Sequence, residues 1–140
     1  MMFRANCRCG RISFVSRKPP IFQFNCHCSD CRKATGDSFC KTAIFVSLDC
    51  QINGEWFRRS FVADSGALTH RDACQSCSDV MFDVSERYPK LTGVLAERMA
   101  APFRFIPSCH LWTQSKLAEV SISDGLPLYE KGMVPMKTSS

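Results

Sequence analysis

The sequence predicts a mainly β fold, and three observations carry this prediction. Short apolar segments recur along the chain, each bounded by glycine, proline or other turn-forming residues. Several segments alternate apolar and polar side chains, which is typical of half-buried strands. Helical periodicity is scarce, because only residues 96–101 favour a helical turn and Pro102 ends it. We therefore expect one mainly β domain over residues 1–132, followed by a loose tail over residues 133–140.

The expected strands follow one another from the N-terminus. The first contains Ile12 and Phe14, which alternate with polar residues, and it ends before a pair of prolines that cannot continue a central strand. A second alternating run at 21–25 leads into a cysteine-rich turn, and residues 33–38 form a loop rich in turn-forming residues. Further short strands are expected at 39–46, 56–62, 68–71, 80–84, 91–95 and 109–112, with a hairpin turn at 64–66.

Length, charge and cysteine content narrow the class of protein. The 140 residues fit one domain with its own core. The net charge of +5 comes from scattered basic residues in runs of at most two, which argues against a nucleic-acid-binding surface. No apolar run reaches bilayer length, and residues 1–7 lack the apolar core of a signal peptide. We therefore expect a cytoplasmic protein with no membrane segment, in which ten cysteines indicate metal or redox chemistry.

The most concentrated chemistry lies at residues 26–31, where three thiols occupy six positions: Cys26, Cys28 and Cys31. Thiols in this pattern can converge on one soft divalent ion, and zinc fits best. Three ligands leave a tetrahedral ion with an open position, as in catalytic zinc sites, where water or a substrate atom binds. Two alternatives stay open, a closed structural site completed by a distant ligand such as Cys109, and thiols that bind no metal.

Two further thiol pairs lie far apart in the sequence. Cys7 and Cys9 together with Cys74 and Cys77 provide four ligands for a structural zinc that would join an N-terminal strand to a distant hairpin. The alternative for Cys74-x-x-Cys77 is a redox dithiol. That motif normally opens a helix within a βαβ unit, and none is indicated here.

The histidines and one further cysteine have structural interpretations. His27 lies between the first two thiols of the trio, and adjacent residues on extended backbone point to opposite faces. We therefore expect it to face solvent or to lie behind the metal ligands rather than to act as a base. His70 and His110 are expected to be structural histidines in strands. Cys40 is expected to be a core thiol, because buried cysteine behaves as a small hydrophobe.

The order of these motifs resembles the family of glutathione-dependent formaldehyde-activating enzymes, which includes the centromere protein V relatives. The likeness runs from about Cys7 to about Tyr129. Its motifs are Cys7-x-Cys9-Gly10, Cys26-His27-Cys28-x-x-Cys31-Arg32 followed by Thr35-Gly36, Arg71-x-x-Cys74-x-x-Cys77, and the closing segment Asp124-Gly125-Leu126-Pro127-Leu128-Tyr129.

The resemblance implies an Mss4-like fold of small antiparallel sheets. It implies addition of glutathione to formaldehyde, a reaction of the carbon–sulfur lyase class that gives S-hydroxymethylglutathione, with a small thiol and a small aldehyde as partners. Arg32 and Lys33 are candidates for binding the carboxylates of glutathione, with plain surface charge as the alternative. The implied metal ligands are Cys7, Cys9, Cys74 and Cys77 for a structural zinc, and Cys26, Cys28 and Cys31 for a catalytic zinc.

The chain departs from the family pattern near two motifs. Ala73 and Ser78 flank the C-x-x-C pair where relatives carry phenylalanine and glycine, and Ser78 would be strained if the turn requires positive φ. Ala118 replaces a tryptophan, which predicts a different or wider substrate pocket. Two other functions stay open: a non-catalytic zinc module for protein or nucleic-acid partners, as in centromere protein V relatives, and an enzyme for a different thiol or aldehyde.

Overall fold

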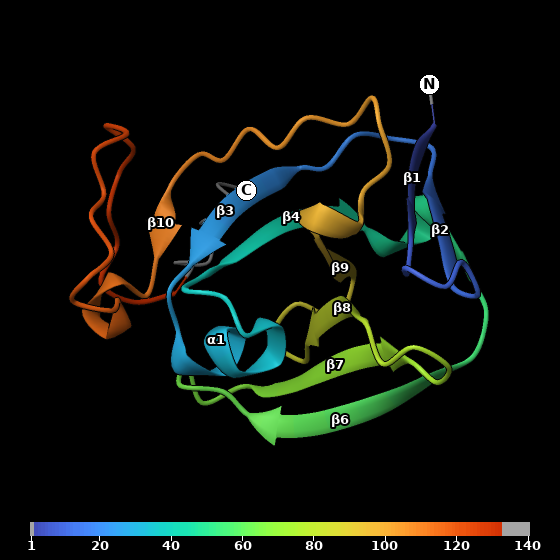
Figure 1. The fold of residues 1–140 in the computed structure, drawn as a ribbon, viewed down its shortest axis with the longest axis horizontal. Coiled ribbons are helices and arrows are strands. Elements are labelled where there is room, and N and C mark those ends of the chain that lie inside the picture. Colours follow the sequence, from blue (N-terminus) through green and yellow to red (C-terminus); the bar gives the residue numbers. More distant parts are fainter. Residues whose placement is uncertain (1, 133–140) are drawn as a thin grey trace, which may run out of the picture.

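The computed structural model describes residues 2–132 and confirms the mainly β architecture (Figure 1). The smaller sheet contains β1 (Phe3–Asn6), β2 (Ser13–Ser16) and β5 (Cys50–Asn53). The larger sheet contains β3 (Phe22–Cys26), β4 (Cys40–Val46), β6 (Trp56–Val62), β7 (Leu68–Cys74), β8 (Val80–Ser85), β9 (Leu91–Leu95) and β10 (His110–Leu111). The helical elements are α1 (Ser29–Thr35) and the 3-10 turns η1 (Ser47–Asp49), η2 (Ala96–Arg98) and η3 (Thr113–Ser115).

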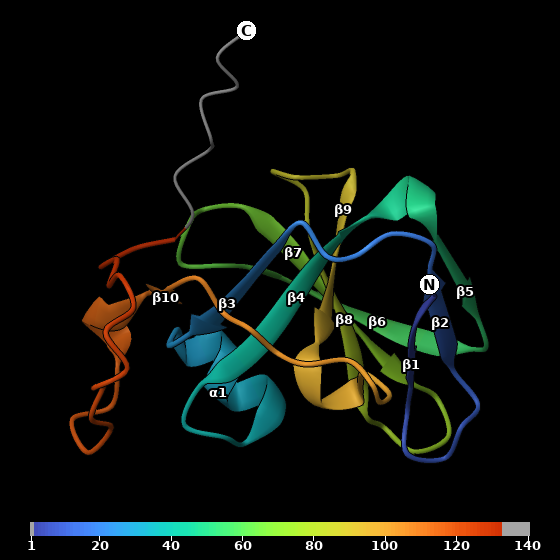
Figure 2. The ribbon, with the colours of Figure 1, turned by 90° about the horizontal axis from the view of Figure 1, so that it is seen from above.

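The two strands of the large sheet that end in thiols, β3 and β7, are not neighbours in the strand order. The small sheet has the order β1-β2-β5, and the large sheet has the order β10-β3-β4-β9-β8-β7-β6. All of these pairs are antiparallel except β10 with β3, which is parallel. Figure 1 shows β3 and β4 on one side of the molecule, β6 and β7 on the other, and α1 between them. Figure 2 shows the small sheet at the end opposite β10.

One hydrophobic core packs between the small sheet and the large one. Its largest side chains are Phe14 of β2, Phe45 of β4 and Phe82 of β8, all fully buried. The ring of Phe14 lies edge-on to that of Phe45, with centroids 5.0 Å apart, and 5.9 Å from that of Phe82. Such aromatic pairs add to the stabilisation that burial itself gives, so this cluster fixes the small sheet on the large one.

A second core lies on the other face of β4. Side chains alternate between the two faces of a strand, so Ala43 and Phe45 enter the first core while Cys40 and Ile44 enter the second. The second core also contains apolar side chains of β3, β9 and β10, together with five of the cysteines: Cys26, Cys28, Cys31, Cys40 and Cys109. The predicted three-thiol site is therefore built into a hydrophobic core.

Helix α1 is the main element that the sequence pattern did not indicate, since a loop was expected over 33–38. Its N-terminus is capped by the Cys28 side chain, whose Sγ accepts a hydrogen bond from the backbone N–H of Cys31. Its C-terminus is closed by Gly36, which has a φ of 76° and donates its N–H to the carbonyl of Arg32. A thiol takes the capping position that serine or aspartate usually fills, so the usual start signal was missing.

The remaining differences are small. Strands β1 and β5, of four residues each, were not expected. The helical turn expected at 96–101 is the shorter 3-10 turn η2. The tail predicted at 133–140 lies outside the described residues. Over residues 2–132, no helix combines the length and the apolar character needed to cross a membrane.

Candidate metal centres and the adjoining cavity

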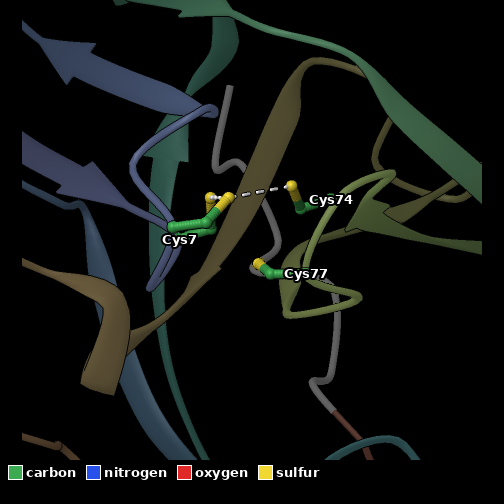
Figure 3. A group of neighbouring side chains, drawn as sticks. Cys7, Cys74 and Cys77 are labelled. Carbon is green, nitrogen blue, oxygen red and sulfur yellow. Dashed lines mark hydrogen bonds between the residues drawn. The ribbon is translucent and has the colours of Figure 1, made fainter.

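Four thiols from two distant segments converge at the end of the small sheet. Cys7 and Cys9 follow β1, while Cys74 ends β7 and Cys77 lies in the turn before β8 (Figure 3). Their four sulfur atoms all lie within 4.8 Å of one another, with Cys7 Sγ 3.4 Å from Cys9 Sγ and Cys9 Sγ 3.6 Å from Cys74 Sγ. Tetrahedral zinc with Zn–S bonds of 2.3 Å places its sulfur ligands about 3.8 Å apart, so this cluster fits zinc in both number and spacing.

The electrostatics of this cluster also favour a cation. Burial alone raises the pKa of Cys7, but hydrogen bonds from the Ile12 N–H and from neighbouring thiols lower it to about 6. A hydrogen bond from the Arg11 backbone lowers the pKa of Cys9, but desolvation and the neighbouring thiols raise it to about 12. Four adjacent thiols therefore cannot all ionise on their own, and a divalent ion supplies the missing positive charge.

The turn around Cys77 shows the strain expected from its sequence. Ser78 has a φ of 65°, in the left-handed region that favours glycine. Its N–H nevertheless donates to the carbonyl of Cys74 at 2.9 Å, which closes the turn. Next to it, the carboxylate of Asp79 accepts the backbone N–H of Arg8 at 2.7 Å, which joins the two halves of the site. The turn keeps its geometry without the glycine of its relatives.

The three remaining motif thiols converge at the start of α1. Cys26 ends β3, Cys28 caps α1 and Cys31 lies in its first turn. Their sulfur atoms lie within 4.8 Å of one another, and those of Cys26 and Cys28 are 3.4 Å apart. Neighbouring thiols, followed by burial, raise the pKa of Cys26 well above its usual range. As in the four-thiol cluster, a soft divalent ion would allow full ionisation, and the donor set fits zinc.

No fourth ligand from the described part of the chain completes the trio. Among residues 2–132, no further cysteine, histidine or carboxylate atom joins the converging group. Cys109 is buried in the same core, but its sulfur lies outside the group. Cys40 is also buried, as expected, and its thiol donates to the Cys31 carbonyl at 3.3 Å. The trio therefore has the composition of an open site rather than a closed one.

Arg71, which lies on β7 of the large sheet, contacts the trio. Its Nη2 donates to Cys31 Sγ at 3.3 Å, and the residue is only 4% exposed. Its second partner is the partly exposed Asp83 of β8, with Nη1 and Oδ2 3.7 Å apart. The buried guanidinium therefore places a positive charge beside the sulfur atoms of the trio.

A cavity of about 790 Å³ opens onto the trio, which is large enough for a tripeptide-sized ligand. Cys26 and Cys28 line it, together with Trp112, which stands in the left-handed region with a φ of 58°. Trp112 provides an aromatic wall, and Ala118 does not line the cavity. The other lining side chains include aromatic, basic and acidic groups: Phe24, Phe61 and Tyr88; Arg71, Arg87 and Lys131; and Asp30, Asp64 and Asp83.

The two basic residues expected to bind substrate lie outside this cavity. Arg32 Nη1 donates to the carbonyls of His27 and Ser115, both at 2.6 Å, so its guanidinium is bonded to backbone. Lys33 lines a separate cavity of about 330 Å³ together with Arg59. Their role in thiol binding stays a prediction. The basic residues of the main cavity come from β7, the turn after β8 and the C-terminal segment, and only Arg71 belongs to a recognisable motif.

His27 does not face solvent, which corrects one of the two expectations for it. The side chain is fully buried, with its ring centroid 4.8 Å from that of Phe39. Its Nε2 lies 2.9 Å from Nδ1 of His110, whose Nε2 lies 2.7 Å from Oδ2 of Asp124. Burial, followed by His110, lowers the pKa of His27 to about 4. The ring is not part of the converging three-thiol group and does not line the main cavity.

His70 has the structural role expected of it. Its Nδ1 lies 2.7 Å from the hydroxyl of Ser60 on β6, and its Nε2 lies 3.0 Å from the carboxylate of Glu86. Both ring nitrogens thus have partners, and the ring joins β6 and β7 to the end of β8.

A mainly β fold with a closed four-thiol cluster and an open three-thiol cluster defines a protein of the Mss4-like fold with two candidate metal centres. Within that class, residues 2–115 match the family model of the glutathione-dependent formaldehyde-activating enzymes, and the chain belongs to this family. The sequence resemblance is thereby confirmed.

A solved structure shares the fold. It is the crystal structure of a Rhodobacter sphaeroides protein that is 17% identical in sequence, with a TM-score of 0.51. The alignment covers 90% of this chain and 98% of that one. A likeness at this level of identity concerns the fold alone. The comparison with curated proteins finds no match.

Proposed function

We propose that the protein is a zinc enzyme that adds glutathione, or a related small thiol, to formaldehyde or another small aldehyde. The observation that carries this proposal is the open trio: three buried thiols have no fourth ligand among residues 2–132, and two of them, Cys26 and Cys28, line a cavity of about 790 Å³. Membership of the formaldehyde-activating family supports the same chemistry. We further propose a cytoplasmic location, where thiols stay reduced.

The trio, Cys26, Cys28 and Cys31, would hold the metal. When bound, zinc with an open position supplies a Lewis-acidic site that favours the ionised form of a substrate thiol at neutral pH. In the reaction, the sulfur of the thiol forms a bond to the aldehyde carbon and the carbon–oxygen π bond breaks. The proton released by the thiol ends on the new hydroxyl oxygen. No oxidant or reductant is needed.

The protein's own residues would position the reactants. Arg71, bonded to Cys31 Sγ, keeps positive charge beside the thiols. Trp112 forms part of an aromatic wall that limits water near the sulfur. Arg87 and Lys131 supply cationic groups for the carboxylates of an anionic thiol, because guanidinium and ammonium groups both bind carboxylates.

Zinc content and turnover test the proposal together. We expect two zinc ions per chain in the wild type and one in the Cys26→Ser/Cys28→Ser variant, with formation of the hydroxymethyl thioether followed by NMR. The variant should show only the uncatalysed rate. One zinc ion in both proteins would contradict the open metal site. Two ions without turnover, accompanied by salt-sensitive DNA binding, would favour the non-catalytic module instead.

The carboxylate contacts have a separate test. Arg87→Gln is expected to raise KM for glutathione by several-fold, and to leave KM for the uncharged-tail thiol 2-mercaptoethanol unchanged. Arg104→Gln is the matched control, because Arg104 is exposed and lines neither cavity. Equal KM values for glutathione in the two variants would remove Arg87 from the binding site.

A further inference from the structure

A chain of three polar side chains runs from the metal-binding turn to the surface. It begins at His27, which is completely buried, continues through the buried His110 of β10, and ends at Asp124, whose side chain is 45% exposed. Both contacts are short: the His27–His110 contact, at 2.9 Å, joins residues 83 positions apart, and the His110–Asp124 contact, at 2.7 Å, joins residues 14 positions apart. None of these side chains lines the main cavity. The proposed reaction therefore gives these three side chains no role.

The direction of the hydrogen bonds follows from Asp124. A hydrogen bond from His110 lowers the pKa of Asp124, so its carboxylate is ionised and can only accept. With both rings neutral, His110 carries its proton on Nε2 and accepts on Nδ1, and His27 donates from Nε2. This leaves His27 Nδ1 without a proton, and that atom has no partner among residues 2–132. One carboxylate thus fixes the tautomers of two buried rings.

The same turn is bonded to the C-terminal segment through its backbone. The N–H of His27 donates to the carbonyl of Leu111 at 3.0 Å, and its own carbonyl accepts from Arg32 at 2.6 Å. The strand that carries His110 is held in turn by residues 127–129, since the His110 N–H donates to Pro127 and the Tyr129 N–H donates to the His110 carbonyl. The ring, the N–H and the carbonyl of His27 are therefore all restrained.

We propose that Asp124, acting through His110 and His27, is a positioning residue for the three-thiol site. His27 lies between Cys26 and Cys28, so fixing its ring and backbone keeps those two sulfurs directed toward Cys31 before metal binds. A preorganised site binds more tightly, because ordering of the turn no longer opposes binding. Partners behind metal ligands typically contribute about 10- to 100-fold in affinity. The inference rests on the proposed metal site and concerns its strength.

Asp124→Asn is the informative variant. The Leu126 N–H donates to Oδ1 of Asp124 at 3.0 Å, and an amide oxygen can keep that bond. The amide NH₂ then faces His110 and would donate where the carboxylate accepted. Both imidazoles must switch tautomers to follow, which leaves a buried N–H at His27 Nδ1 without a partner. The variant therefore preserves the loop and reverses the direction of the hydrogen bonds that join position 124, His110 and His27.

The experiment is a titration of the purified variants with zinc against a chromophoric chelator, with the imidazole tautomers read by ¹⁵N NMR. We expect Asp124→Asn to weaken the binding of one of the two zinc ions by about tenfold or more, and to leave the affinity of the four-thiol cluster for its ion unchanged. The intact four-thiol ion shows that the variant is folded. Asp124→Glu, which restores a carboxylate, is expected to regain part of the affinity. Glu119→Gln, an exposed acid in the same segment, should match the wild type.

Two outcomes would overturn the inference in distinguishable ways. If Asp124→Asn binds both ions as tightly as Glu119→Gln does, Asp124 serves the loop alone and the positioning role is wrong, while the proposed metal site stands. If the wild type binds only the four-thiol ion, the proposed metal site and the inference fail together. A general loss of stability would lower the unfolding midpoint without changing the affinity of the folded protein for its second ion.

Discussion

The two thiol clusters use the same side chain for opposite purposes. The four-thiol cluster joins segments that are 65 residues apart, and its ligands complete it. The three thiols of the trio lie within six residues of one turn and lack a fourth ligand among residues 2–132, and two of them, Cys26 and Cys28, line a cavity. A metal in the first site closes a long loop and so stabilises the fold. A metal in the second site closes almost no chain, and its position is useful chiefly for chemistry.

The two clusters also differ in the groups that contact their thiols. Around the four-thiol cluster, the supporting groups are backbone N–H groups of neighbouring residues, such as Ile12 to Cys7 Sγ at 3.3 Å. Around the trio, support comes from side chains of remote strands, Arg71 and the histidine chain. Mutations should therefore separate the sites cleanly.

The largest effect is expected from Cys74→Ser. Removing a ligand from the closed site should lower Tm by more than about 10 °C, because structural zinc contributes on the order of 10 kcal/mol of folding free energy in small domains. Thermal unfolding followed by circular dichroism measures this. Cys50→Ser is the matched control, since Cys50 lies outside both clusters, and a shift of only about 3 °C is expected. Equal shifts would mean that the four-thiol cluster does not stabilise the fold.

Cys28→Ser should reverse the pattern. We expect a Tm within about 5 °C of the wild type, loss of one zinc ion per chain, and a fall in turnover of about 100-fold or more. Elemental analysis and the NMR assay measure these quantities. Cys40→Ala is the control, because Cys40 is a buried thiol of the same core that is not part of the trio, and it should retain two ions. Loss of a zinc ion in both variants would mean that the second ion has been assigned wrongly to the trio.

Arg71→Gln should have an intermediate effect on both properties. The substitution removes the guanidinium that contacts Cys31 Sγ and Asp83. We expect the free energy of unfolding to fall by about 2 kcal/mol. This loss is below the usual range for a broken buried ion pair, because the Asp83 side chain is 28% exposed. Affinity for the second zinc ion should fall as well, while the four-thiol ion is unchanged. Urea unfolding and chelator competition give the two values. Arg104→Gln should change neither, and unchanged stability in Arg71→Gln would show that the ion pair contributes nothing.

The smallest effect is expected from Ser78→Gly, and it is stabilising. Ser78 adopts a φ of 65°, where a side chain is unfavourable by roughly 1 kcal/mol relative to glycine. The variant should gain about 0.5–1 kcal/mol in unfolding free energy, measured with urea. Ser38→Gly, at an exposed position whose φ is not positive, should lose a few tenths. A loss at position 78 would mean that the turn is unstrained.

The sequence predicted those parts of the site whose residues are close together in the chain, or whose pairing leaves few alternatives. Cys26, Cys28 and Cys31 are close in the chain, so their convergence follows from spacing alone. The four-thiol cluster joins distant pairs, but only two pairs with ligand spacing were available. The strain at Ser78 was also predictable, because a tight turn after a C-x-x-C pair commonly requires positive φ.

The sequence did not reveal what depends on long-range pairing. The parallel pairing of β10 with β3 places His110 beside Asn25, next to the turn that carries His27, and no local pattern indicates such a partner. The alternation rule placed His27 opposite its neighbouring thiols, but it does not say what covers that side. The cavity draws its walls from strands at both ends of the large sheet, so its basic residues were equally out of reach.

The chain order of these parts has a consequence for synthesis on the ribosome. All four ligands of the closed cluster have been made once residue 77 is complete, whereas Asp124 follows 47 residues later. At translation rates of about 5–20 residues per second, the interval is roughly 2–9 seconds. The scaffold can thus acquire its first ion while the nascent chain still lacks β10. The support that Asp124 gives to the second centre becomes available only after those 47 residues, so the two centres become complete at different times during synthesis.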